Sequence, residues 1–273
     1  MKSYKPAVCF LISLSLFVPV RTLAQTDIGA LVGQMTLEEK ASLVTGQNGW
    51  ETRAIRRLGI PAAWMADGPV GLRKSKGSDP TKNVPATAFP SAAALSATWN
   101  PGLIERVGAG IGAEARNQDV VLLLGPGLNL KRHPLGGRNF EYYSEDPLLS
   151  GKIAAAFVRG VQSQGVGATL KHFAVNNQEY RRMVIDARVG PRALRELYLR
   201  GFEIAVKEGR PQAVMSAYNR VNGISASARS FFLTDILRGQ WGFDGLVVSD
   251  WGAVNDPVAS LAAGSIWKCP AIP

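Results

Sequence analysis

The sequence contains very little cysteine and very little histidine. Its 273 residues include two cysteines, Cys9 and Cys269, and two histidines, His133 and His172. Cys9 lies in the first apolar segment and Cys269 close to the last residue, so removal of that segment leaves one thiol and no internal disulfide. No Cys/His spacing typical of a metal site occurs. We therefore expect a protein without a disulfide framework, a metal centre or a cofactor.

Long apolar runs are also scarce, and one occurs at the start of the chain. Residues 7–20 read AVCFLISLSLFVPV, with Lys2 and Lys5 before them and TLA, residues 22–24, after them. A basic start, an apolar middle and a small-residue cleavage site are typical of a secretory signal peptide. The run is short of the roughly 20 residues that span a membrane. We therefore expect residues 1–24 to be cleaved and the mature protein to be exported, periplasmic or secreted, without stable membrane association.

Acidic residues are outnumbered by basic ones. The formal charge is +10, or +7 once Lys2, Lys5 and Arg21 are removed with the signal peptide. A charge of this sign raises the question of a nucleic-acid partner. However, the lysines and arginines are scattered in runs of at most two, and no nucleic-acid-binding motif surrounds them. We expect a solvated basic surface and no nucleic-acid partner.

Apolar runs of strand length alternate with helical segments along most of the sequence. The apolar runs cover residues 60–68, 119–130, 167–175, 212–219 and 243–252. The helical segments cover residues 102–118, 148–165, 192–209 and 231–242. A capping box and two pairs of a capping residue with proline mark helix starts at Thr36, Asn100 and Asp146. Strands that alternate with helices form a parallel sheet, and the length suits one α/β barrel of about 250 residues.

Polar side chains follow each of these apolar runs. They are Asp67 in the first run; Asn129 and a loop with Arg132, His133, Arg138, Asn139 and Glu141 after the second; Lys171 and His172 in the third; Ser216, Tyr218 and Asn219 in the fourth; and Asp250 in the fifth. Barrel enzymes carry their chemistry at the carboxyl ends of the strands, whereas an open doubly wound sheet concentrates polar groups at one switch point. The pattern therefore favours a (β/α)8 TIM-type barrel of the α/β class, with Asp250 as a site residue on a rigid strand.

Two other interpretations of the motifs are weaker. Residues 108–115, GAGIGAEA, resemble a dinucleotide fingerprint, but the third glycine comes one residue early and the segment lies inside a helical pattern. We expect these small residues at a close helix–sheet contact. His172 would suit a Ser-His-Asp hydrolase, but no serine lies in a G-x-S-x-G elbow. Acids, amides, Lys, His, Arg and Trp together can instead hold a pyranose, and glycoside hydrolysis needs two acids.

Six ordered motifs resemble one family. They run from about residue 27 to about residue 264 and read MTLEEKASLVTG, MADGPVGLR, GPGLNLKRHPLGGRNFEYYSEDP, GVGATLKHFAVNNQE, VMSAYNRVNG and GFDGLVVSDWGAV. In this order and without large gaps, they are similar to the N-terminal barrel domain of glycoside hydrolase family 3, the β-glucosidase type. The resemblance implies a retaining β-glycosidase that removes terminal non-reducing β-D-glucosyl residues.

The resemblance also implies roles for individual residues. Asp250, in SDW, matches the catalytic nucleophile, and Trp251 follows it. The positions that bond the sugar in the glycone subsite are matched by Asp67, Arg138, Lys171, His172 and Arg182, and those that line it by Met215 and Tyr218. The N-acetylhexosaminidases of the family carry a His-Asp loop, about Lys-His-Phe-Pro-Gly-His-Gly-Asp, where this chain has KHFAVNNQE. That departure argues against the hexosaminidase branch.

In the β-glucosidase branch the acid/base glutamate comes from a second α/β domain far downstream, which this chain does not contain. Relatives continue after ASLNAG with about Leu-Asp-Leu-Glu-Met-Pro, whereas this chain reads ASLAAGSIWKCPAIP. A one-base shift of codons for Asp-Leu-Glu-Met-Pro gives Ile-Trp-Lys-Cys-Pro. We therefore expect residues 25–264 to form the barrel domain, incomplete at its C-terminal end, and residues 265–273 to be an out-of-frame tail. An inert remnant that at most binds sugar is the alternative function.

Overall fold

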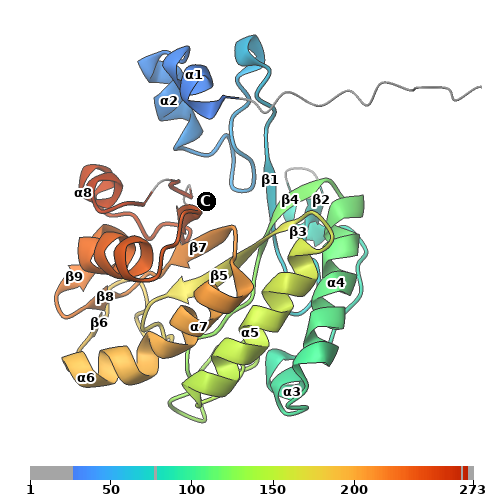
Figure 1. Ribbon diagram of the computed structural model, residues 1–273, viewed down its shortest axis with the longest axis vertical. Helices are drawn as coiled ribbons and strands as arrows, with labels where there is room; N and C mark the ends of the chain where they lie inside the picture. Colours follow the sequence, from blue (N-terminus) through green and yellow to red (C-terminus); the bar gives the residue numbers. More distant parts are fainter. Residues whose placement is uncertain (1–26, 77–78, 266, 270–273) are drawn as a thin grey trace, which may run out of the picture. The chain divides into compact units, whose positions relative to one another are not determined.

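The computed structural model describes residues 27–76, 79–265 and 267–269 (Figure 1). The expected signal peptide, residues 1–24, lies outside the described residues, and so does part of the expected out-of-frame tail. The domain boundaries at residues 25 and 264 therefore stay predictions. Within the described ranges, no helix combines the length and the apolar character needed to cross a membrane.

Residues 27–35 belong to a short unit that contains helix α1 (Ile28–Gly33). The side chain of Asp27 accepts a hydrogen bond from the N–H of Ala30 and caps this helix. The large unit begins at Thr36, and its first helix is α2 (Leu37–Leu43). Thr36 accepts from the N–H of Glu39, and the Glu39 side chain accepts from the N–H of Thr36, which confirms the predicted capping box.

Five parallel strands form the central sheet of the large unit, in the order β1-β4-β5-β7-β10. They are β1 (Trp64–Asp67), β4 (Val120–Leu124), β5 (Gly167–Phe173), β7 (Ala213–Ser216) and β10 (Leu246–Ser249). Each strand lies within one of the five apolar runs and pairs with the next in parallel, so the predicted α/β class and parallel sheet are confirmed. Pairing in sequence order is how the strands of an α/β barrel are arranged.

Helices cover one face of this sheet (Figure 1). They are α4 (Pro101–Asn117), α5 (Pro147–Gln162), α6 (Pro191–Ala193), α7 (Arg200–Gly209) and the π-helical segments η2 (Leu194–Tyr198) and η4 (Phe231–Gln240). The four predicted helical segments are therefore present. Asn100 and Asp146 accept hydrogen bonds from the N–H groups of Leu103 and Leu149, as the predicted caps require.

The remaining elements are short. They are η1 (Arg56–Leu58), β2 (Ser75–Lys76), β3 (Asp79–Asn83), α3 (Ala92–Ser96), β6 (Asp186–Ala187), β8 (Arg220–Val221), β9 (Ile224–Ser225), η3 (Ala226–Ala228) and α8 (Pro257–Ala262). Strands β2 and β3 form an antiparallel hairpin, and β6, β8 and β9 form a small separate sheet. The sequence did not predict these elements, because most are too short to show a hydrophobic period.

Two apolar cores lie on the two faces of the central sheet. The core between the sheet and the helices includes Leu123, Phe157, Leu170, Phe202 and Phe232. The other core, here called the barrel interior, consists of Met65, Leu122, Leu124, Ala213, Met215, Val248, Trp267 and Cys269. Neighbouring residues of β4 therefore point to opposite cores, as the pleat of a strand requires.

The glycines of segment 108–115 make their closest contacts with a helix rather than with the sheet. They lie on α4, which packs along α5. A Cβ atom on Gly108 would lie 2.5 Å from the carbonyl oxygen of Phe157, and a Cβ atom on Gly160 would collide with the carbonyl oxygen of Glu105. The helix also contacts β4, but the close approach at these glycines joins two helix backbones, which glycine permits by lacking a side chain.

Short backbone pairs connect the two outer strands of the sheet. The pairs are Val248 of β10 with Trp267, Lys268 with Thr45, Gly46 with Thr52, and Glu51 with Trp64 of β1. Among the described residues the sheet has five of the eight strands of a complete barrel, so the barrel is incomplete as predicted. Trp267 and Cys269, which belong to the expected out-of-frame tail, are 3% and 1% exposed and fill the barrel interior.

Candidate active site

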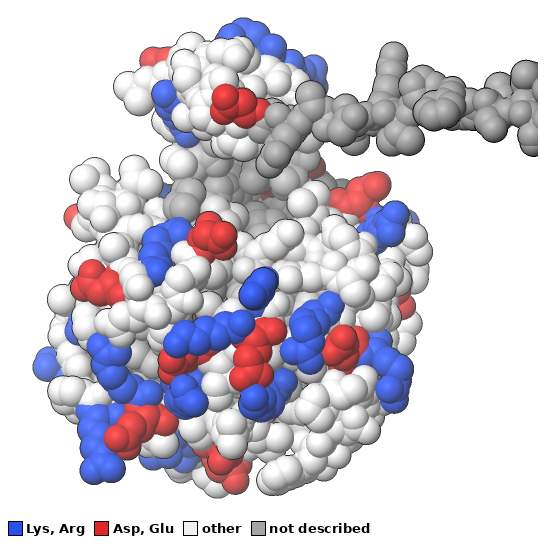
Figure 2. Space-filling model, viewed as in Figure 1, with Lys and Arg blue, Asp and Glu red and all other residues white. Residues whose placement is uncertain are grey.

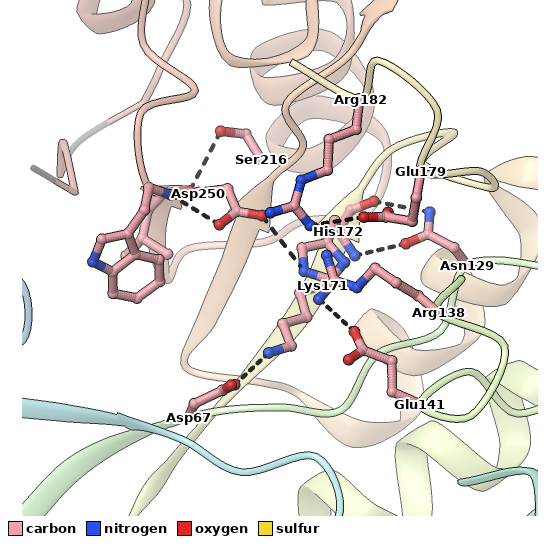
Figure 3. Close-up of polar contacts among 12 residues, drawn as sticks. Asp67, Asn129, Arg138, Glu141, Lys171, His172, Glu179, Arg182, Ser216 and Asp250 are labelled. Atoms are coloured by element: carbon pink, nitrogen blue, oxygen red, sulfur yellow. Dashed lines mark hydrogen bonds and ion pairs between the residues drawn. The ribbon is translucent and has the colours of Figure 1, made fainter. Parts of the chain in front are cut away.

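The parallel strands bring most of the predicted site residues to one edge of the sheet (Figure 3). Asp67 ends β1, Lys171 and His172 lie near the end of β5, Ser216 ends β7, and Asp250 directly follows β10. Because the carboxyl ends of parallel strands share an edge, these side chains converge although they are far apart in the sequence. The result is a polar cluster at the position where barrel enzymes carry their chemistry.

Asp250 is buried and held from two sides, yet one of its oxygens is free. Its N–H donates to the carbonyl oxygen of Ser216 at 3.1 Å, and the N–H of Trp251 donates to its Oδ1 at 2.8 Å. Within the described residues its Oδ2 has no hydrogen-bond partner and lies 3.5 Å from Nε2 of His172. Burial raises the pKa of Asp250, against the opposing effects of the Tyr218 hydroxyl and the Trp251 N–H. The backbone therefore fixes one oxygen of a buried carboxylate and leaves the second oxygen without a hydrogen-bond partner.

Asp67 links two cations at the end of β1. Its Oδ1 lies 2.6 Å from Nζ of Lys171, and its Oδ2 lies 3.1 Å from the guanidinium of Arg73. Burial alone would raise the pKa of Asp67, but Lys171, with Arg73 and Arg138, lowers it below its ordinary value. Asp67 is therefore an ionised acceptor beside a buried ammonium group, which is a suitable pair for binding vicinal hydroxyls.

His172 is held by its backbone and by its ring. The amide of Asn129 accepts from the N–H of His172 at 2.8 Å and donates to its carbonyl oxygen at 2.9 Å. The hydroxyl of Tyr142 lies 3.1 Å from Nδ1 of the imidazole. Burial, with the charges of Arg138 and Lys171, holds the pKa of His172 well below its usual range, so the ring is neutral. Asn129 was one of the polar residues that the sequence placed at the strand ends, whereas the sequence assigned no role in the site to Tyr142.

Two arginines of the predicted site form ion pairs with acids. Arg138 lies 2.5 Å from Oε1 of Glu141, and Arg182 lies 2.7 Å from Oε2 of Glu179. Arg182 also lies over the ring of Tyr218, 4.7 Å from its centroid. Figure 3 shows both guanidinium groups directed toward the cluster. These contacts give Glu141 and Glu179 the role of positioning the arginines.

Trp251 lies beside a second indole that the sequence did not indicate. Its Nε1 donates to the carbonyl oxygen of Gly49 at 2.8 Å, and its ring centroid lies 5.0 Å from that of Trp50. Trp50 falls in a loop without hydrophobic periodicity, so no sequence signal assigned it to the site. The two rings form an aromatic corner next to Asp250.

Met215 and Tyr218, predicted to line the glycone subsite, occupy different surroundings. Met215 is 1% exposed and belongs to the barrel interior. Tyr218 lies beyond the end of β7, where burial and the neighbouring Asp250 carboxylate raise its pKa above the ordinary value. Tyr218 is therefore a neutral hydroxyl next to Asp250. Met215 lies in the barrel interior, against which Trp251 packs.

The cluster suits a neutral ligand rich in hydroxyl groups. It combines carboxylate acceptors with Lys, Arg and His donors, and it has an aromatic corner on one side. Over the part of the chain that the structure describes, no three His, Cys, Asp or Glu side chains gather as a metal site would need. A fixed carboxylate with a free oxygen can attack an electrophilic carbon. The cluster therefore lies where α/β-barrel enzymes carry their active sites.

Comparison with known proteins identifies the family. The model of the glycosyl hydrolase family 3 N terminal domain matches residues 19–262. This chain belongs to glycoside hydrolase family 3, and the resemblance stated from the six motifs is confirmed.

The matched relatives are mostly named as β-glucosidases. Thermostable beta-glucosidase B of Acetivibrio thermocellus is 56% identical over 248 residues, covering 89% of this chain and 33% of that protein. The exo-alpha-(1->6)-L-arabinopyranosidase of Bifidobacterium longum is 53% identical over 244 residues, covering 88% of this chain and 32% of that protein. The chain therefore spans about a third of the length of these relatives.

A solved structure supports the same fold. Beta-glucosidase 3B of Thermotoga neapolitana, in complex with alpha-D-glucose, is 49% identical and superimposes with a TM-score of 0.85 over 89% of this chain and 36% of that protein. The TIM-type barrel predicted from the sequence is therefore confirmed as the fold of this chain.

Proposed function

We propose that this chain is the barrel part of a retaining β-glycosidase of the β-glucosidase type, in which Asp250 is the nucleophile. The observation that carries the proposal is the free Oδ2 of Asp250 in a buried polar cluster, while its Oδ1 is fixed by the N–H of Trp251. The β-glucosidase relatives, and the solved relative with glucose bound, support a terminal β-D-glucosyl residue as the substrate group.

The geometry supports covalent catalysis. In the proposed first step, Oδ2 of Asp250 attacks the anomeric carbon, the bond to the departing oxygen breaks, and a glycosyl ester forms on Asp250. Water then cleaves the ester and restores the carboxylate. Two carboxylates about 5–5.5 Å apart serve a retaining mechanism, so a second acid is required.

The second acid is proposed to be a glutamate outside this chain. Glu141 and Glu179 lie in ion pairs with Arg138 and Arg182, which leaves neither placed as a proton donor to a departing oxygen. The matched part is about a third of each of these relatives, and the group is proposed to come from the part beyond it. General acid assistance is worth about 10²–10⁴-fold in rate. This chain alone should therefore act on substrates whose leaving group departs without a proton.

The glycone is proposed to lie between Asp67 and Asp250. Asp67 and Lys171 would bond one pair of hydroxyls, while Arg138, Arg182 and His172 would bond others. Trp251 is proposed to stack on the group beyond the cleaved bond, with Met215 and Tyr218 supporting the pocket wall.

The test is covalent labelling of the chain. The probe is a dinitrophenyl β-glucoside that carries fluorine on the carbon next to the anomeric centre, because its leaving group needs no acid and its ester is long-lived. We expect mass spectrometry to find one glucosyl label on Asp250. Asp250→Asn should take no label, because an amide cannot form the ester. Asp244→Asn, which changes an exposed aspartate just before β10, is the matched control and should label like the parent chain.

The other outcomes separate the alternatives. A label on another residue would overturn the assignment of Asp250. No label on a folded chain would favour the inert remnant that at most binds sugar. The arabinopyranosidase name of one relative makes L-arabinopyranose a second glycone candidate, and faster release of dinitrophenol from the α-L-arabinopyranoside than from the β-glucoside would favour it.

We also propose that the protein is exported to the periplasm or secreted. The support is the basic and apolar pattern of residues 1–24, and it comes from the sequence alone. N-terminal sequencing of the mature protein should begin at Gln25. A mature chain that still begins at residue 1 or 2 would contradict the proposal.

A further inference from the structure

Tyr142 and His172 form a buried hydrogen bond, and the surroundings of the two side chains indicate which of them donates. The Tyr142 hydroxyl lies 3.1 Å from Nδ1 of His172, and both residues are at most 2% exposed. The other ring nitrogen, Nε2, lies 3.5 Å from Oδ2 of Asp250. A neutral imidazole carries one proton, so one of its nitrogens donates and the other accepts.

The surroundings of the ring favour the proton on Nε2. In its ionised form Asp250 offers only acceptors, so an unprotonated Nε2 would direct a lone pair at this carboxylate. On the other side, the Tyr142 hydroxyl can donate to an unprotonated Nδ1. Burial raises the pKa of Tyr142 well above its ordinary value, so its proton is retained. Both neighbours of His172 therefore favour the same tautomer.

We propose that Tyr142 is a positioning residue that holds His172 in the Nε2–H tautomer, with this N–H facing Oδ2 of Asp250. Asn129 fixes the backbone of His172 through two hydrogen bonds, and Tyr142 fixes the ring. His172 then presents a donor, and no positive charge, to a sugar hydroxyl. The role toward a sugar rests on the proposed function, whereas the tautomer does not.

Nuclear magnetic resonance of the two histidines tests the tautomer directly. In a chain labelled with nitrogen-15 in histidine, only His133 and His172 contribute imidazole signals, and His133→Asn identifies them. His133 is exposed and supplies the reference signals of an imidazole outside the cluster. His172 should show a protonated Nε2 and a hydrogen-bonded, unprotonated Nδ1 at neutral pH. A protonated Nδ1 in the parent chain would overturn the proposal without any variant.

Tyr142→Phe removes the donor to Nδ1. We expect the Nδ1 signal of His172 to move, either to that of an acceptor without a donor or to a mixture of the two tautomers. Tyr143→Phe is the matched control, because Tyr143 is the next residue, equally buried, and its ring packs in the core between sheet and helices. An unchanged Nδ1 signal in folded Tyr142→Phe would overturn the proposal.

The labelling rate of Asp250 shows whether the tautomer matters for the reaction. Tyr142→Phe should slow labelling about five-fold, the factor that corresponds to one neutral hydrogen bond of about 1 kcal/mol. In a His172→Asn background the same change should have no further effect, because the two residues act as one unit. An equal loss in both backgrounds would show a merely structural role for Tyr142. Absence of any label in the parent chain would instead refute the proposed function and leave the tautomer result standing.

Discussion

At the scale of single residues, the site is organised by partners that the sequence does not reveal. The strand ends predicted Asp67, Lys171, His172 and Asp250 as members of one cluster, because parallel strands place their carboxyl ends together. Which side chain pairs with which depends on the register between strands and on side-chain orientation, and the apolar pattern of the sequence specifies neither. The ion pair of Asp67 with Lys171 was therefore not predictable from the sequence, although each member was.

Replacing Lys171 by methionine should cost more stability at neutral pH than at acidic pH. The pKa of Asp67 is lower in the folded chain than in the unfolded one, so its contribution to the free energy of unfolding is complete above the unfolded-state pKa and is lost as pH falls through the folded-state pKa. Without Lys171, a buried carboxylate lacks its nearest cation, and the loss should be about 3 kcal/mol at neutral pH. Protonation of Asp67 removes the need for a cation, so the loss should shrink in acid.

Urea unfolding at a series of pH values measures this effect. Lys152→Met is the control, because Lys152 pairs with Glu208 on the surface, where the two side chains are 48% and 42% exposed. Its loss should be about 0–1 kcal/mol, with little change between neutral and acidic solution. A loss for Lys171→Met that stays constant with pH would contradict the role given to Asp67.

At the scale of the elements, helix and strand positions follow from the sequence, but their contacts do not. The alternating apolar runs predicted β1, β4, β5, β7 and β10 and the helical segments between them. The pattern of small residues in α4 showed that something approaches closely, but it could not distinguish a sheet from a helix. The partner is α5, and the contact is made through Gly108 and Gly160.

Gly160→Ala should therefore destabilise the fold although it removes a glycine from a helix. The added methyl group would collide with the carbonyl oxygen of Glu105 on α4, which is backbone and cannot move aside alone. Overpacking of this kind costs about 1–3 kcal/mol. Gly102→Ala in α4 is the control, since its methyl group would meet only the Asn100 side chain, at 3.5 Å. That change should be neutral or stabilise by up to about 1 kcal/mol, and chemical denaturation compares the two.

At the scale of the whole large unit, the sequence predicted an incomplete barrel but not how its edges are connected. Residues 45–52 and 267–268 link β10 to β1 through isolated backbone pairs. An isolated backbone pair involves one residue on each side, so it produces no alternation of polar and apolar residues in the sequence. This connection could therefore not be predicted.

The surface charge agrees with the sequence. Figure 2 shows basic and acidic side chains interspersed over one face, as expected for scattered rather than concentrated charge.

Trp267→Ala tests the contribution of this connection. Trp267 is 3% exposed and lies in the barrel interior, so its truncation should cost about 3–5 kcal/mol. Trp99, which is 74% exposed, supplies the control, and Trp99→Ala should change the free energy of unfolding by less than about 0.5 kcal/mol. Similar midpoints of urea unfolding for the two variants would show that the connection adds nothing.

The hydrogen bond from Trp251 to Gly49 also sets an order of events during synthesis. It joins groups 202 residues apart. A ribosome delivers a chain from its N-terminus, so Gly49 has left the tunnel long before Trp251 is made. Asp250 directly precedes Trp251, so the loop that carries this carboxylate and the indole that anchors it are made together. The barrel strands can pair as they emerge, whereas the contact between residues 49 and 251 is one of the last to form.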